Sequence, residues 1–104
     1  MKKVAILGFG TVGVGVADIL RDNADVVAKH AGECVELKYV VDLREMPESP
    51  YADKMVKDFE IVVNDPEVGI VVEAIGGVGA ALAMVRKALA AGKSVVTSNK
   101  QLVA

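Results

Sequence analysis

The stretch that decides the fold is Val4-Ala5-Ile6-Leu7, followed directly by Gly8-Phe9-Gly10-Thr11-Val12-Gly13. An apolar run, the spacing G-x-G-x-x-G and an amphipathic segment together predict a strand, a turn and a helix that bind a dinucleotide pyrophosphate. We expect Gly8 to permit the turn, Gly10 to let a phosphate approach the backbone, and Gly13 to let the helix pack close to the strand. The helix would direct its free N–H groups and its positive dipole end toward the phosphates. The alternative is a glycine-rich turn between two packed elements.

The composition is that of a small domain with one hydrophobic core. The chain has 104 residues, 53% hydrophobic and 4% aromatic, and a formal net charge of -2. Valine-rich runs are typical of a parallel sheet covered by helices. Without a basic patch, nucleic acid is not an expected partner, and no apolar run reaches the roughly 18 residues of a membrane span. No metal-ligand spacing occurs, and the single Cys34 cannot form an internal disulfide, which agrees with a reducing cytoplasm.

Hydrophobic periodicity predicts alternating strands and helices along the whole chain. The expected strands span residues 3–7, 35–41, 60–63, 69–75 and 94–97. The expected helices span residues 11–29 and 78–91, with a further helix that begins in a capping box at Ser98. Residues 43–58 are expected to form a loop with one helical turn near 52–56, and residues 65–67 a single helical turn. This order predicts one domain, residues 1–104, with an α/β Rossmann-type fold: a doubly wound parallel sheet in three layers, strand order 3-2-1-4-5.

Two charged residues follow the second expected strand. Asp42 ends that strand, where an acid accepts hydrogen bonds from the adenosine ribose, although it lies further from Gly13 than the usual spacing of about 20 residues. The alternative is a solvated loop aspartate. Arg44 would hold a 2′-phosphate, or else it is a surface charge. Because Asp42 favours NAD and Arg44 favours NADP, the sequence leaves the choice open, with use of both included.

Three features mark the carboxyl ends of the last two strands. Glu73 is the single charge in residues 69–75, and we expect it either to orient a loop N–H or a lysine, or to be a structural hydrogen-bond acceptor. Gly76-Gly77 would let the backbone approach the nicotinamide-side ribose, or else forms a tight turn. Lys100 opposes the helix dipole by about 0.3–1 kcal/mol. Since it lies at the edge where ligands bind, we expect a functional role; the alternative is a side chain that curls into solvent.

Four segments of the chain together resemble the amino-terminal domain of homoserine dehydrogenase. They are Gly8-Phe9-Gly10-Thr11-Val12-Gly13, Val41-Asp42-Leu43-Arg44, Val71-Val72-Glu73-Ala74-Ile75-Gly76-Gly77 and Gly92-Lys93-Ser94-Val95-Val96-Thr97-Ser98-Asn99-Lys100. The segments occur in the family's order and cover nearly the whole chain. The last is the most discriminating, because few Rossmann enzymes continue a G-K-x-V-V strand with T-(A/S)-N-K.

The resemblance implies an oxidoreductase that interconverts L-homoserine and L-aspartate 4-semialdehyde with NADP or NAD, in cytoplasmic threonine, methionine and isoleucine biosynthesis. It implies that Phe9, Thr11 and Val12 contact the cofactor and that Arg44 meets the 2′-phosphate in members that use NADP. Lys100 would lie beside the nicotinamide and substrate, as a cofactor contact or a catalytic, proton-handling residue. Family members continue into a substrate and dimerisation domain. The sequence is therefore expected to be a truncated cofactor domain, inactive alone, whose full-length enzyme is a homodimer.

Two other functions remain as alternatives. Aspartate dehydrogenase shares the first glycine turn and the V-V-E run, but it lacks the Asn99-Lys100 pair. A nucleotide-sensing regulatory module would also open with G-x-G-x-x-G and place an acid after the second strand. Such a module has no reason to contain Gly76-Gly77 or the segment at residues 97–100.

Overall fold

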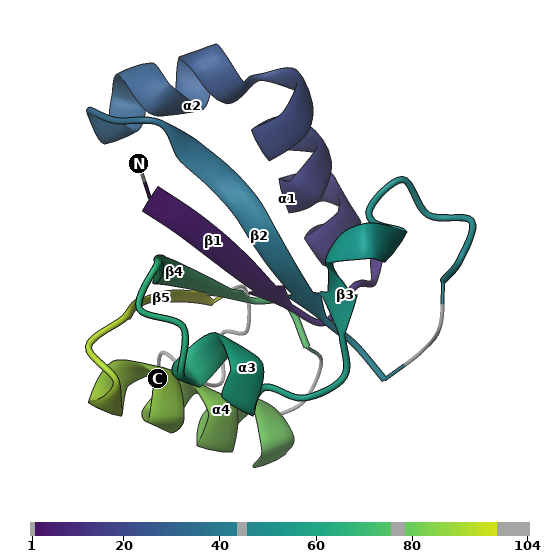
Figure 1. The fold of residues 1–104 in the computed structure, drawn as a ribbon, viewed down its shortest axis with the longest axis vertical. Helices are drawn as coiled ribbons and strands as arrows, with labels where there is room; N and C mark the ends of the chain where they lie inside the picture. Colours follow the sequence, from purple (N-terminus) through teal and green to yellow (C-terminus); the bar gives the residue numbers. More distant parts are fainter. Residues whose placement is uncertain (1, 44–45, 76–78, 98–104) are drawn as a thin grey trace.

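The centre of the protein is a five-stranded parallel sheet in the order β3-β2-β1-β4-β5 (Figure 1). The computed structural model describes residues 2–43, 46–75 and 79–97. Its strands are β1 (Lys2–Leu7), β2 (Val35–Val41), β3 (Met55–Val56), β4 (Val68–Glu73) and β5 (Ser94–Thr97). The parallel pairing and the central place of β1 confirm the predicted doubly wound topology.

Helices cover both faces of the sheet, which gives the three expected layers (Figure 1). On one face lie α1 (Thr11–Asp22) and α2 (Ala24–Ala31), and on the other lie α3 (Glu60–Val63) and α4 (Gly79–Ala90). A short 3-10 turn, η1 (Ala52–Lys54), precedes β3. Because successive side chains of a strand point to opposite faces, β1 contributes to the core on both sides of the sheet.

Each layer of helices encloses its own hydrophobic cluster. The cluster toward α3 and α4 contains Ala5, Leu7, Val41, Phe59, Val62, Val68, Val71 and Ala88. The cluster toward α1 contains Ile6, Phe9, Ala17, Leu37, Val40 and Tyr51. Both clusters therefore reach the carboxyl ends of β1 and β2, and they hold these ends rigidly in place.

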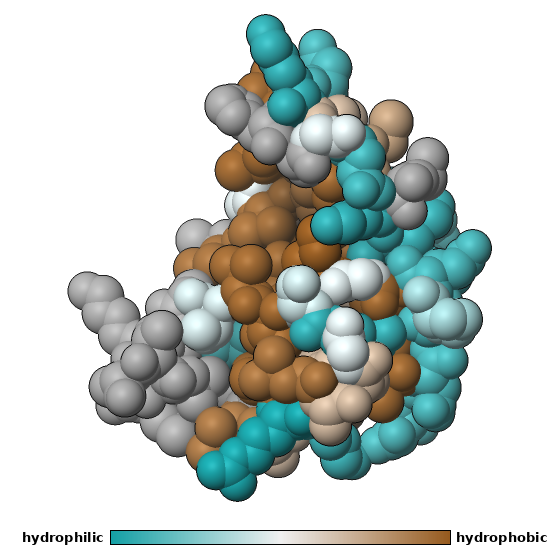
Figure 2. Space-filling model, turned by 90° about the vertical axis from the view of Figure 1, so that its left-hand side faces the viewer, coloured by the Kyte–Doolittle hydropathy of each residue, from teal (hydrophilic) through white to brown (hydrophobic). Residues whose placement is uncertain are grey.

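One face of β4 and β5 is not covered by any described helix. Val95 packs against the cluster under α4, so Val96 points to the other face, where it is 58% exposed. Val72, its partner in the β4–β5 register, packs beside the α1 cluster. Figure 2 shows a band of hydrophobic side chains on one side of the molecule, bordered by hydrophilic residues.

The expected first helix over residues 11–29 is two helices in the structure. Asn23, with φ -124° and ψ 35°, leaves helical geometry and lies between α1 and α2. Its N–H donates to the Ile19 carbonyl, and its carbonyl accepts from the Val27 N–H, so each helix still has a backbone bond at the break. The Asn23 side chain makes no capping hydrogen bond at the start of α2.

The expected third strand was placed too late in the chain. Residues 60–63 form α3 instead, and both its N-cap Phe59 and Val62, three positions later, enter the core. The third strand is Met55–Val56, where a helical turn was expected, and it pairs with Val40 and Val41. A strand of two residues is too short to show the period of two from which strands are predicted.

The other differences are small. Residues 65–67 form a turn that is not helical, in which the Asp65 carboxylate accepts the Glu67 N–H at 2.9 Å. Strand β4 begins at Val68 and ends at Glu73, and α4 ends at Ala90, one residue earlier than expected, while the expected first residue of that helix, Val78, lies outside the described residues. The predicted helix at Ser98 lies outside the described residues.

Candidate cofactor-binding site

The site is a cleft at the carboxyl ends of β1, β2 and β4, where the order of the strands in the sheet reverses. Ligands bind at this switch point in open α/β sheets. The cleft has a volume of about 440 Å³. Its lining residues are Gly8, Phe9, Gly10, Val41, Asp42, Leu43, Lys57, Ala74, Ile75 and Met84. A mostly apolar wall with a few charged groups is typical of a site for a small molecule.

Two glycines of the turn are required by the geometry of the chain itself. Gly8 has φ +87°, and a Cβ there would lie 2.8 Å from Ile75 Cγ1. A Cβ on Gly13 would lie 2.3 Å from the Gly8 carbonyl oxygen, so only glycine allows α1 to come this close to the end of β1. These two residues do what the motif predicts of them for the turn and for helix packing.

Gly10 differs from the other two glycines, because a Cβ there would meet no atom within 4 Å. Its backbone is extended (φ -85°, ψ -158°), a conformation that any residue adopts. Nothing in the described fold therefore requires glycine at this position. The open space beside Gly10 is where the motif places the pyrophosphate.

The amino end of α1 suits an anion. Gly10 caps the helix without a side-chain hydrogen bond, and within the described chain its first turn carries no acidic residue. The Val14 N–H makes the first helical bond, to the Gly10 carbonyl at 2.9 Å. The N–H groups of the residues before it belong to the first turn of the helix, which leaves them for a ligand or water.

Asp42 lies against the glycine turn. Its Oδ2 accepts the Phe9 N–H at 2.9 Å, while the Gly8 N–H donates to the Val41 carbonyl at 2.8 Å. The half-buried carboxylate thus joins the end of β2 to the turn. This arrangement differs from that of a solvated aspartate in an open loop. Asp42 also lines the cleft, as it must if it is to accept hydrogen bonds from the adenosine ribose.

Phe9 points away from the cofactor's expected place. Its ring is 3% exposed and meets the Tyr51 ring edge-on, with centroids 5.6 Å apart. Tyr51 is itself buried and donates to Asp18 at 2.6 Å, and burial together with this hydrogen bond raises the pKa of Tyr51 to about 12. A cofactor contact from Phe9 is therefore expected from its main chain, whereas Val12, half-exposed on α1, keeps its side chain available.

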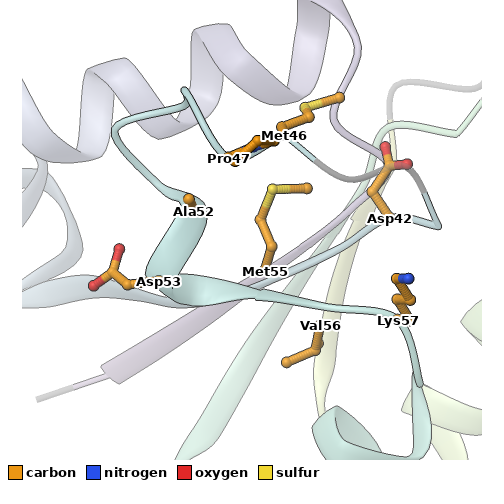
Figure 3. A pocket seen from close by; sticks show the side chains of 8 residues that line it. All are labelled: Asp42, Met46, Pro47, Ala52, Asp53, Met55, Val56 and Lys57. Carbon is orange, nitrogen blue, oxygen red and sulfur yellow. The ribbon is translucent and has the colours of Figure 1, made fainter.

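Lys57 is a site residue that the sequence analysis did not find. It lines the cleft and also a neighbouring hollow, whose walls are Asp42, Met46, Pro47, Ala52, Asp53, Met55, Val56 and Lys57 (Figure 3). Figure 3 shows that Asp42 and Lys57 come from adjacent segments at the same end of this hollow. Lys57 directly follows β3. Because the third strand was predicted at residues 60–63, Lys57 was not expected at the end of a strand.

Glu73 is fully buried at the end of β4, and its carboxylate has two identified donors. The Ile75 N–H donates to Oε2 and the Thr97 hydroxyl donates to Oε1, both at 2.5 Å. This geometry agrees with both expected roles, as a group that orients a loop N–H and as a structural acceptor. Thr97 was missed, because its importance comes only from this contact.

Several predicted site residues lie outside what the structure describes. They are Arg44, Gly76, Gly77 and Lys100, together with the side chain of Thr11. Their roles remain predictions. In residues 2–43, 46–75 and 79–97, no group of three His, Cys, Asp or Glu side chains gathers in a way that could hold a metal ion. The same residues contain no helix with the length and apolarity that crossing a membrane requires.

Comparison with known proteins identifies the family. Residues 8–104 match the family model described as homoserine dehydrogenase, NAD binding domain. The homoserine dehydrogenase of Pseudomonas aeruginosa is 41% identical over 98% of this chain, and that of Neisseria gonorrhoeae is 40% identical over 97%. In both cases the match covers 24% of the relative, so the chain spans about a quarter of the length of these proteins.

Solved structures agree with this result. The homoserine dehydrogenase from Thiobacillus denitrificans superposes with a TM-score of 0.87 and 38% identity, over 98% of this chain and 24% of that one. The homoserine dehydrogenase of S. aureus superposes with a TM-score of 0.84 and 29% identity, over 97% of this chain and 26% of that one. With its sequence matched by the family model and its fold matched by these structures, the chain belongs to the homoserine dehydrogenase family and corresponds to its NAD-binding domain.

Proposed function

We propose that this chain is the cofactor half of an enzyme that interconverts L-homoserine and L-aspartate 4-semialdehyde with NAD or NADP. The observation that carries the proposal is the glycine turn, packed against α1 at a cleft of the switch point, in a chain of this family. Residues 1–104 form one cofactor domain. The remaining three quarters of the relatives' length would supply the substrate contacts, so this chain alone is expected to bind cofactor without turnover.

The pyrophosphate would lie over the turn from Gly8 to Gly13. The backbone beside Gly10 and the amino end of α1 supply N–H groups and a partial positive charge. Thr11 and Val12 begin that helix, and they would flank the phosphates. Gly8 and Gly13 allow the turn and α1 to pack closely together. They would therefore contribute to binding through the shape of the turn rather than through contacts of their own.

The adenosine ribose would lie between Asp42 and the cations near it. Asp42 offers a carboxylate to the ribose hydroxyls, which favours NAD. Lys57 in the structure and Arg44 in the sequence supply positive charge for a 2′-phosphate, which favours NADP. We propose that the site accepts both cofactors, because one group of each kind faces the same end of the cleft.

The nicotinamide end would lie at the carboxyl ends of β4 and β5. Gly76 and Gly77 follow β4 and would let the backbone approach the nicotinamide ribose. Lys100 follows β5, and we assign it the catalytic role of this domain, as a contact to cofactor and substrate or as a proton-handling residue. Bound nicotinamide supplies the hydride chemistry.

The setting of the enzyme also belongs to the proposal. We infer that the full-length protein is a cytoplasmic homodimer of threonine, methionine and isoleucine biosynthesis, without nucleic-acid or membrane partners. The net charge of -2 speaks against a nucleic-acid partner, and the relatives' name, homoserine dehydrogenase, supports the biosynthetic role.

Titration of the chain with NADH and NADPH, followed by fluorescence and calorimetry, tests the proposal. We expect weak binding of both, and no binding of either at millimolar concentration would refute it. Gly10→Val fills the open space beside the turn without a clash, so it should lower both affinities at least about tenfold, while the far-UV circular dichroism spectrum remains that of the folded chain. Reduction of NADP with homoserine by this chain alone would contradict the need for the remaining residues.

A further inference from the structure

A buried carboxylate connects the ends of two neighbouring strands at the edge of the proposed site. Glu73 is the last residue of β4 and has Thr97, the last residue of β5, as its register partner. Its two oxygens accept from different segments, one from the Thr97 hydroxyl and one from the Ile75 N–H. Because the side chain is 0% exposed, it cannot touch a ligand in the cleft.

The two donors lead directly into the segments assigned to the nicotinamide. Ile75 immediately precedes Gly76-Gly77, and Thr97 is followed by Ser98-Asn99-Lys100. The Glu73 carboxylate therefore holds, by one hydrogen bond each, the last described residue before each of these segments.

Stability alone does not account for a carboxylate at this place. Burying a carboxylate is costly unless hydrogen bonds compensate, and an apolar side chain of similar volume is often equally stable or better. What a carboxylate adds is geometry, because each oxygen requires a donor at a defined distance and direction. Glu73 thus specifies where Ile75 lies relative to the end of β5.

We propose that Glu73 is a positioning residue that assembles the nicotinamide subsite. It acts through the Ile75 N–H and the Thr97 hydroxyl, and it fixes Ile75, which lines the cleft, against the end of β5. This inference rests on the proposed function. It predicts that a change at Glu73 or Thr97 affects the nicotinamide half of the dinucleotide and spares the adenosine half.

Two ligands of the unmodified 104-residue chain separate these halves. NADH and ADP-ribose share the adenosine and the pyrophosphate, but only NADH carries nicotinamide. Thr97→Val keeps the shape of the side chain and removes the donor, and Glu73→Gln replaces one accepting oxygen with an amide that cannot accept. For each variant we expect NADH affinity to fall about tenfold, the worth of about one hydrogen bond, with ADP-ribose affinity unchanged. Thr97→Ser, which retains the hydroxyl, should restore NADH affinity.

The matched control is Tyr39→Phe, which removes the hydrogen bond from the Tyr39 hydroxyl to Asp65 outside the cleft. It should lower the melting temperature and leave the ratio of the two affinities unchanged. If Glu73→Gln fails to fold, the NADH and ADP-ribose affinities of Thr97→Val and Thr97→Ser are sufficient to test the positioning role.

The outcomes distinguish this inference from the proposed function. Equal losses of NADH and ADP-ribose affinity, or no loss of either, would overturn the positioning role while the binding function stands. The positioning role would also be overturned if the unmodified chain bound NADH no more tightly than ADP-ribose. An unmodified chain that binds neither ligand would overturn both proposals.

Discussion

The contact between Gly13 and the carbonyl of Gly8 can be tested with a matched pair of substitutions. A Cβ on Gly13 would lie 2.3 Å from the Gly8 oxygen, whereas a Cβ on Gly15, in the same helix, would meet nothing within 4 Å. Glycine to alanine in a helix interior gains about 1 kcal/mol at either position from helix propensity. The difference between Gly13→Ala and Gly15→Ala therefore measures the clash alone.

The size of the clash follows from the geometry. Ordinary contact begins near 3.4 Å, so the helix and the turn must separate by about 1 Å. Both partners belong to the backbone, so neither can rotate away, and Ile6 blocks a sideways shift because its Cγ2 would be 3.3 Å from the new atom. Overpacking of this kind costs about 1–3 kcal/mol, and we expect the upper end, about 3 kcal/mol.

Urea denaturation followed by far-UV circular dichroism measures this difference. With a slope of about 1.5 kcal/mol/M, the midpoint of Gly13→Ala should lie about 2 M below that of Gly15→Ala. The same movement takes the amino end of α1 away from the turn, so NADH affinity should fall in the Gly13 variant alone. Coincident midpoints for the two variants would refute the argument that close packing of α1 on the turn requires glycine.

The remaining predictions concern stability outside the cleft. Hydrogen bonds from Lys38 and Tyr39 lower the pKa of Asp65 to about 2; because the folded pKa lies below the unfolded value, the carboxylate stabilises the fold above about pH 4. This contribution, about 1–2 kcal/mol after allowance for solvent screening, should be lost as the pH falls through 2. Urea titrations at stepped pH measure it, and an unchanged pH profile in Asp65→Asn would contradict it. Lys93, 7% exposed, donates to the Asp65 and Val68 carbonyls at 2.8 and 2.7 Å, so Lys93→Met should cost about 1–3 kcal/mol in denaturant; a variant as stable as the parent would show that these bonds contribute nothing net. Val62→Ala, at a fully buried site of α3, should lower the free energy of unfolding by about 1–3 kcal/mol in the same assay, and a loss below about 0.5 kcal/mol would mean that α3 is not part of the core.

Long apolar runs made most of the sheet predictable from the sequence. The second and fifth strands have the predicted bounds. The second alternates apolar and charged residues before Tyr39-Val40-Val41 and ends at Asp42, and the fifth follows the Gly92-Lys93 turn. The third strand and the break at Asn23 were missed, since a two-residue strand and a single irregular residue leave no periodic signal. The strand order was still correct, because it follows from the handedness of the crossovers rather than from the position of each strand.

The glycine turn and Asp42 could also be predicted, because the spacing of the motif carries its own physical reasons. Lys57 and Thr97 could not. Neither residue belongs to a local pattern, and each acquires its place only where another segment meets it: Lys57 beside Asp42, and Thr97 on the carboxylate of Glu73.

The sequence by itself determined the family, the order of the strands and the position of the phosphate-binding turn. The family and the turn follow from short motifs whose residues are close together in the chain, and the strand order follows from the handedness of the crossovers. Only the tertiary structure decided which distant groups meet at the cleft. A parallel sheet brings the carboxyl ends of its strands to one edge, so Phe9 reaches Asp42 and Glu73 reaches Thr97 across long sequence separations. Such contacts depend on register and side-chain direction, which the order of residues in one strand does not reveal.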